Sequence, residues 1–106
     1  MAQFTLDLNK KLLNSDDAPM KDGVGKDVEM NKVLANELWK PGKENVIKFY
    51  DWGFSLWKTG IITFDRTDAD LLKLLIERND WDVFTKGRFL DELSKATSQE
   101  LKIALP

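Results

Sequence analysis

The sequence predicts a single domain of the α+β class, with four helices and a small antiparallel sheet of up to three strands. Three observations support this fold class. Residues 44–64 are the densest apolar stretch, and their polar residues recur at helical spacing. Residues 4–8 alternate between apolar and polar side chains, as a half-buried strand does. Leucine and phenylalanine recur near helical spacing in the last third of the chain. A length of 106 residues suits one domain.

The first 14 residues predict a β-hairpin. After the alternating stretch come Asn9 and Lys10, and Asn tolerates the positive φ that a two-residue turn requires. We therefore expect strands at 3–8 and 11–14. An isolated hairpin is marginal in water, so residues 61–64 are expected to add a third strand.

Residues 15–26 predict a mobile loop. They hold a proline, two glycines and three aspartates without hydrophobic periodicity. Gly23 and Gly25 lack the preceding strand and the Lys-Ser/Thr pair of a phosphate-binding loop, so loop flexibility explains them better. We find no internal repeat in the sequence.

Residues 27–95 predict a helical core, beginning with two helices at about 28–40 and 44–59. Asp27 can cap the first, and Pro41-Gly42 stops it. The short connection predicts an antiparallel pair. Gly53, in the middle of the second helix, indicates a close helix–helix approach, and Gly60 is placed to end that helix.

Two further helices are expected at about 67–78 and 82–95. Thr67 and Asp70 resemble a capping box, and Asp82 can cap the last helix. Gly87 is a second candidate for a close approach. Residues 96–106 are expected to form a loosely ordered tail.

The predicted core joins apolar positions from all of these elements. Its members are Phe4, Leu6, Val33, Leu34, Leu38, Phe49, Trp52, Leu56, Phe64, Leu72, Leu75, Leu90 and Leu93.

Composition argues against most enzyme classes. The chain has no cysteine and no histidine, which removes thiolate catalysis, disulfides, the usual general base and the common zinc ligands. The acidic run 65–70 fails the spacing of a calcium loop, and helix capping explains it. We expect no enzyme activity, no metal and no cofactor.

Three aromatic residues are candidates for contact with a protein partner: Trp39, Tyr50 and Trp81. The alternative for the two tryptophans is that they close the ends of the core. The leading hypothesis is a non-catalytic interaction or accessory protein, whose partner could be its own copy. The alternative function is a small nucleic-acid-associated regulator, which the net charge of −2 and the scattered lysines disfavour.

The start of the chain has no basic segment followed by an apolar one, as a signal peptide would have. No apolar run approaches the roughly 18 residues needed to span a bilayer. We therefore expect a cytoplasmic protein without a membrane partner.

Several short motifs resemble those of small uncharacterised proteins of tailed phages and prophages. They are Leu6-Asp7-Leu8, Val33 to Asn36, Ile47 to Trp52, Gly60 to Asp65 and Lys86 to Leu90. The resemblance covers residues 4–93 and consists of structural motifs. It implies a small accessory protein encoded by a phage or prophage, and it assigns no functional residue.

Overall fold

The computed structural model describes residues 3–40 and 44–104, with side chains as far as residue 97. The elements in order are β1 (Phe4–Asp7), α1 (Met30–Leu38), α2 (Val46–Thr59), β2 (Ile61–Phe64), α3 (Arg66–Arg78) and α4 (Val83–Ala104). The helix-dominated α+β class is confirmed. The chain divides into two compact units, and the boundary passes through β2. The described parts of residues 8–62 form the α1–α2 unit, and those of 1–7 and 63–106 form the α3–α4 unit.

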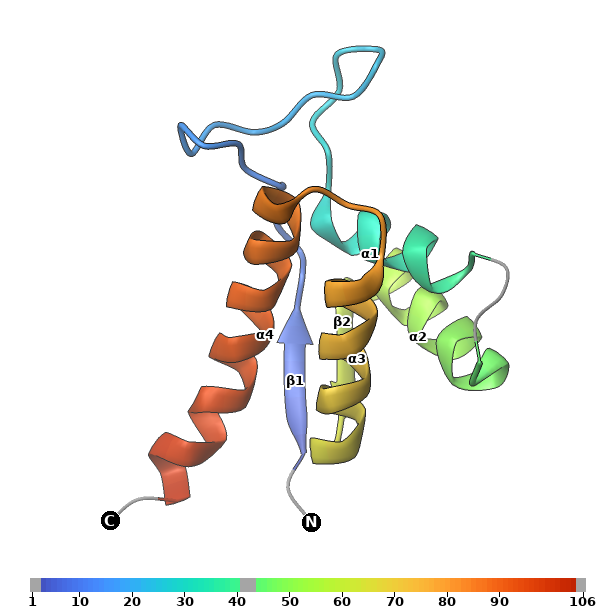
Figure 1. The fold of residues 1–106 in the computed structure, drawn as a ribbon, viewed down its shortest axis with the longest axis vertical. Coiled ribbons are helices and arrows are strands. Elements are labelled where there is room, and N and C mark those ends of the chain that lie inside the picture. Colours follow the sequence, from blue (N-terminus) through green and yellow to red (C-terminus); the bar gives the residue numbers. More distant parts are fainter. Residues whose placement is uncertain (1–2, 41–43, 105–106) are drawn as a thin grey trace. The chain divides into compact units, whose positions relative to one another are not determined.

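In the α3–α4 unit, α4 packs against both β1 and α3 (Figure 1). The alternating residues of β1 are buried and exposed in turn, as the sequence predicts. Phe4 and Phe64 place their rings 5.9 Å apart between centroids. The buried apolar side chains described in this unit are Phe4, Leu6, Phe64, Ala69, Leu72, Ile76, Phe89 and Leu93.

Both helices of this unit begin at a capping aspartate. The Asp82 carboxylate accepts a hydrogen bond from the Thr85 amide at 2.7 Å, which confirms the predicted cap of α4. The predicted capping box at Thr67 is wrong. Asp65 is the cap of α3 and accepts from the Asp68 amide at 2.9 Å, because the strand before it ends at Phe64 and the helix starts at once.

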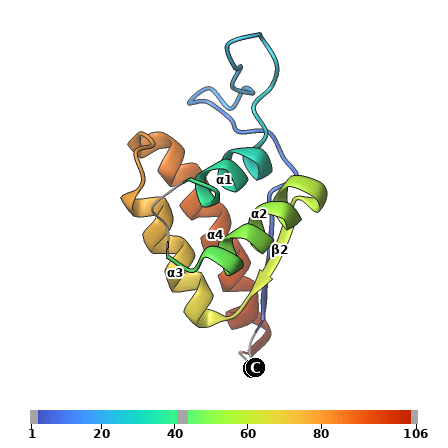
Figure 2. The ribbon, with the colours of Figure 1, turned by 90° about the vertical axis from the view of Figure 1, so that its right-hand side faces the viewer.

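In the α1–α2 unit, α1 lies beside α2 (Figure 2). Asn31, at the start of α1, donates from its buried side-chain amide to the Leu56 carbonyl near the end of α2, at 2.8 Å. Trp39, at the other end of α1, reaches the Tyr50 carbonyl. The predicted antiparallel pairing is therefore confirmed. Gly60 ends α2 with a φ of 75°, also as predicted.

The predicted N-terminal hairpin is wrong. In the described residues the sheet has two strands, β1 and β2, and residues 11–14 pair elsewhere. Asn9 is not in a hairpin turn: its side chain donates to the Thr59 carbonyl and lies against Gly60. The Leu8 amide likewise bonds the Gly60 carbonyl at 2.8 Å, so the chain lies beside residues 59–60 where the turn was predicted.

Residues 11–29 form a hydrogen-bonded loop with three backbone pairings, Lys11 with Glu29, Leu13 with Pro19, and Lys21 with Asp27. Three backbone amides donate in a cycle, all at 2.8 Å: Leu12 to the Val28 carbonyl, Val28 to Met20, and Met20 to Leu12. Leu12, which takes part in two of these hydrogen bonds, is also buried. Its backbone pairing explains why residues 11–14 do not join the sheet.

Two turns with the same hydrogen bonds lie eight residues apart in this loop. The Asn14 side chain accepts from the amides of Asp16 and Ala18, and the Asp22 side chain accepts from those of Val24 and Lys26. The residue three places after each has a positive φ: Asp17 at 58° and Gly25 at 84°. A structural repeat is therefore present where the sequence analysis found none, because side-chain acceptors and not hydrophobic periodicity create it.

Asp27 does not cap α1 as predicted. Lys11 and Lys21 both form ion pairs with its carboxylate, and α1 begins at Met30, preceded by Glu29 without a side-chain cap. The predicted stop at Pro41-Gly42 lies outside the described residues.

Most of the predicted core is buried, but Val33, Trp52, Leu75 and Leu90 are only half-buried. The prediction also missed Leu8, Leu12, Met30, Ala35, Ile62, Ala69, Ile76 and Phe89, all of which are buried. The predicted loose tail is helical as far as Ala104, and residues 105–106 lie outside the described residues.

Candidate interaction surface

Helix α2 presents three different surfaces around its axis. At about 100° per residue, the polar side chains Lys48, Asp51, Ser55 and Lys58 share one arc. A second arc carries the buried Phe49, Gly53 and Leu56. The third is apolar and exposed. We call this third arc, together with Trp39 at the end of α1, the aromatic face; its members are Trp39, Val46, Ile47, Tyr50, Phe54 and Trp57.

The rings of the aromatic face contact one another. Trp39 lies 5.4 Å from Phe54 and 5.8 Å from Trp57, and Tyr50 lies 4.9 Å from Phe54, between ring centroids. The Trp39–Phe54 and Tyr50–Phe54 pairs are edge-on, an arrangement that the ring quadrupoles favour. The four rings therefore form one contiguous surface.

Gly53 brings the Trp39 indole onto α2. A β-carbon at Gly53 would overlap this indole, so only glycine permits the approach. The indole nitrogen also donates to the Tyr50 carbonyl at 3.4 Å. The close approach predicted at Gly53 is confirmed, and it holds the position of Trp39 in the aromatic face. At Gly87 a β-carbon would meet nothing within 4 Å, so the second predicted close approach is wrong.

Two lysines lie against rings of the aromatic face. The Lys32 ammonium is 5.1 Å from the Trp57 ring centroid, and the Lys58 ammonium is 5.2 Å from that of Phe54. Both distances fall within the range of a cation–π contact. The aromatic face therefore has positive charge at its edges.

The structure brings together two of the three predicted contact residues. Trp39 and Tyr50 both belong to the aromatic face, and Tyr50 is the more exposed, at 56%. Trp81 belongs to the α3–α4 unit, where its ring is half-buried and lies 4.6 Å from that of Phe89. Trp81 therefore fits the alternative that it closes a core.

The prediction missed Val46, Ile47, Phe54 and Trp57. The apolar residues of α2 spread over most of its circumference, and a single helix packed against it covers only part of that arc. Counting the predicted elements that could pack against this helix could have indicated that part of its apolar surface stays exposed. It could not have shown which side stays exposed.

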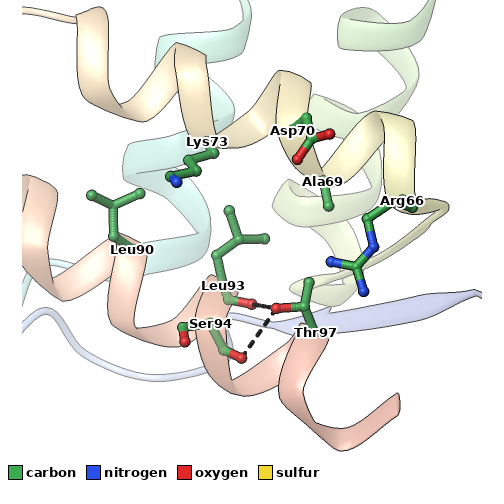
Figure 3. Close-up of a pocket in the computed structure, with 8 residues that line it drawn as sticks. All are labelled: Arg66, Ala69, Asp70, Lys73, Leu90, Leu93, Ser94 and Thr97. Atoms are coloured by element: carbon green, nitrogen blue, oxygen red, sulfur yellow. Dashed lines mark hydrogen bonds between the residues drawn. The ribbon is translucent and has the colours of Figure 1, made fainter. Parts of the chain in front are cut away.

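A pocket with a volume of about 390 Å³ lies in the α3–α4 unit (Figure 3). Arg66 and Lys73 lie toward its two ends, with Leu93 between them. Two of its polar groups have partners within the unit: the Arg66 guanidinium stacks 4.7 Å from the Phe4 ring, and the Thr97 hydroxyl bonds carbonyls of its own helix. Because these two polar groups already have partners within the fold, this pocket is the weaker candidate. Its remaining lining residues are Ala69, Asp70, Leu90 and Ser94.

Two carboxyl groups have a pKa below the usual value, and both shifts have a structural cause. The amide of Thr85 lowers the pKa of Asp82, and the ammonium groups of Lys11 and Lys21 lower the pKa of Asp27. Both changes stabilise the charged form, as expected for a helix cap and an ion pair.

Within residues 3–40 and 44–104, no group of three or more His, Cys, Asp or Glu side chains is arranged to hold a metal ion. None of the helices in these ranges combines the length and apolarity that crossing a bilayer demands.

The aromatic face is thus the most developed candidate site in the described part of the chain. Comparisons with protein families, with curated proteins and with solved structures found no match.

Proposed function

We propose that this chain is a non-catalytic interaction protein that binds another protein through its aromatic face. The observation that supports this most directly is the contiguous ring cluster on an exposed arc of α2. Tyr and Trp are the residues most enriched at the energetic centres of protein interfaces. The resemblance to phage and prophage proteins is the basis for proposing that the chain is an accessory protein of such an element.

The size of the aromatic face also supports binding. Four aromatic side chains of about 200 Å² each, together with two aliphatic ones, would expose on the order of 500 Å² at their observed exposures. The largest apolar patch on a typical monomer is about 300–600 Å² and is often functional. An aromatic face of this size is costly to leave in water, which favours a partner that covers it.

The aromatic face is held in shape before any partner arrives. The Trp39 indole is fixed by its contact with Gly53 and its hydrogen bond to Tyr50. Rigid aromatic groups lose little conformational entropy on binding. A preformed face of this kind suits a binding role.

A direct test is affinity capture with tagged full-length chain from nuclease-treated lysates of host cells, with and without phage infection. The variants Ile47→Ser and Tyr50→Ser alter the aromatic face, and Val83→Ser is the matched control because Val83 is exposed on α4, in the other unit. We expect one dominant protein to be lost with the first two variants and kept with the third. Equal capture by all three variants would contradict the proposal.

The second candidate function is nucleic-acid binding, and the lysines at Trp57 and Phe54 are the observation that favours it. Single-stranded DNA binding that falls steeply with salt, and that Trp57→Ala abolishes, would replace the first proposal with this one. The absence of binding at low salt would exclude this second function.

A further inference from the structure

The exposed side of α2 carries a pattern that matches itself when the helix is reversed. We infer that the protein covering the aromatic face is a second copy of this chain, with the two α2 helices packed antiparallel about a two-fold axis near Phe54. This inference rests on the proposed function and names the partner. A closed two-fold dimer is the commonest assembly of identical chains.

The apolar residues satisfy this symmetry. When two antiparallel helices cross at Phe54, each residue faces the one equally far beyond Phe54 in the other copy. Ile47 then lies toward the C-terminal end of the partner's α2, beyond which Ile61, the first residue of β2, is 37% exposed. Tyr50 comes within one residue, or about 1.5 Å along the axis, of facing Trp57. Phe54 of one chain meets Phe54 of the other.

The charged residues satisfy it as well. Asp51 and Lys58 are both exposed on the polar arc, and a separation of seven residues places them within about 20° of each other around the helix. They adjoin the edge of the aromatic face formed by Ile47 and Phe54. In an antiparallel pair the same edge of each helix lies together, so Asp51 of each copy approaches Lys58 of the other. By symmetry this contact between Asp51 and Lys58 forms twice in the dimer.

The charges also select the direction of packing. In a parallel two-fold pair the two copies of this edge would lie on opposite sides of the interface, so Asp51 and Lys58 of one copy would meet neither charge of the other. Only the antiparallel arrangement brings these opposite charges together. This charge complementarity is the reason to assign the aromatic face to a second copy and not to an unrelated protein.

The experiment is sedimentation equilibrium of the full-length chain from micromolar to near-millimolar concentration. We expect the mass to rise from that of one chain to that of two. Asp51→Lys and Lys58→Asp should each replace two attractions by two repulsions and weaken the dimer by about tenfold. Lys48→Asp makes the same charge change on the far edge of the polar arc and should leave the dimer unchanged.

Two combinations test the geometry itself. The double variant Asp51→Lys with Lys58→Asp exchanges the charges within each chain and should restore the dimer. An equimolar mixture of the two single variants should form a heterodimer, because one chain then carries two lysines at these positions and the other two aspartates. Recovery in both cases identifies the contact as one between chains, whatever small loss of helix stability either single change causes.

Failure of this inference is distinguishable from failure of the proposed function. If the chain stays monomeric while affinity capture still finds a partner whose binding Ile47→Ser abolishes, the dimer inference is overturned and the interaction role stands. If the chain is monomeric and captures nothing, both the dimer inference and the proposed function are overturned. A dimer insensitive to the charge changes at Asp51 and Lys58 also overturns the antiparallel packing.

Discussion

The two helix pairs of this chain use their apolar residues differently. In the α3–α4 unit, α4 packs on both α3 and β1, and the largest apolar side chain in the middle of α4, Phe89, is 1% exposed. In the α1–α2 unit, α2 buries one arc and leaves the neighbouring arc, with Tyr50 and Trp57, in solvent. The first pair thus has its apolar centre covered within the fold. The second has apolar surface left for a partner, which is the physical basis of the proposed function.

The contrast between covered and uncovered aromatic residues gives the largest expected effect. Phe89→Ala should lower the free energy of unfolding by about 3–5 kcal/mol, because it removes a buried ring and leaves a cavity beside Trp81. Phe84→Ala, one and a half turns earlier on α4, removes a ring that is 41% exposed and should cost much less. Urea denaturation measures both. Equal losses would show that α4 is not packed as described.

Glycine to alanine should act in opposite directions in the two units. Gly53→Ala forces a methyl group into the Trp39 indole and should cost about 1–3 kcal/mol, which outweighs the gain in helix propensity. Gly87→Ala meets nothing and should stabilise the protein by up to about 1 kcal/mol. Thermal denaturation of the two variants provides the comparison. A stabilising Gly53→Ala would disprove the close approach of α1 and α2.

Helix capping distinguishes the units on a smaller scale. Asp65→Ala should lower the free energy of unfolding by about 1 kcal/mol, because the Asp68 amide loses its acceptor. Glu29→Ala, at the equivalent position before α1, removes no cap and should have no comparable effect. Chemical denaturation of the two alanine variants measures the difference. A larger loss at Glu29 would contradict the observed start of α1.

The smallest effect concerns pH and the ion pairs of Asp27. Because Lys11 and Lys21 lower the pKa of Asp27 below its usual 3.8, this carboxylate adds stability above that pH and loses the contribution as the pH falls through the lowered pKa. Asp27 in turn raises the pKa of Lys11 above 10.5, so the contribution of Lys11 is full below 10.5 and is lost at higher pH. The ion pairs are solvent-exposed, so the change should be small.

Asp27→Asn provides the measurement. The difference in stability between the parent chain and this variant, followed by denaturation at successive pH values, should be largest between these limits and should shrink on acidification. A difference that grows at acid pH would refute the assignment of the two lysines as partners.

The predictions from sequence succeeded where the cause is local. Asp82 caps α4 and Gly60 ends α2, since a carboxylate three residues before an amide, or a residue without a β-carbon, acts within one turn. They failed where a contact distant in the sequence overrides a local pattern, or where the local signal is not hydrophobic. Asn9 fits a hairpin turn, yet its side chain bonds Thr59, fifty residues away. The signal for the repeated turns was present in Asn14 and Asp22 but is not hydrophobic, so a search for apolar periodicity missed it.

By itself the sequence determined the helix-dominated class, the starts of the helices to within a few residues, and the division of α2 into a polar and an apolar arc, because helical periodicity is a property of neighbouring residues. Only the tertiary structure decided which apolar arc is covered. Trp39 and Tyr50 share the aromatic face, whereas Trp81 packs on Phe89, because α1 meets α2 at Gly53 and nothing described lies over the neighbouring arc. Burial depends on which segments meet in space, and the spacing of residues along one helix does not contain that information.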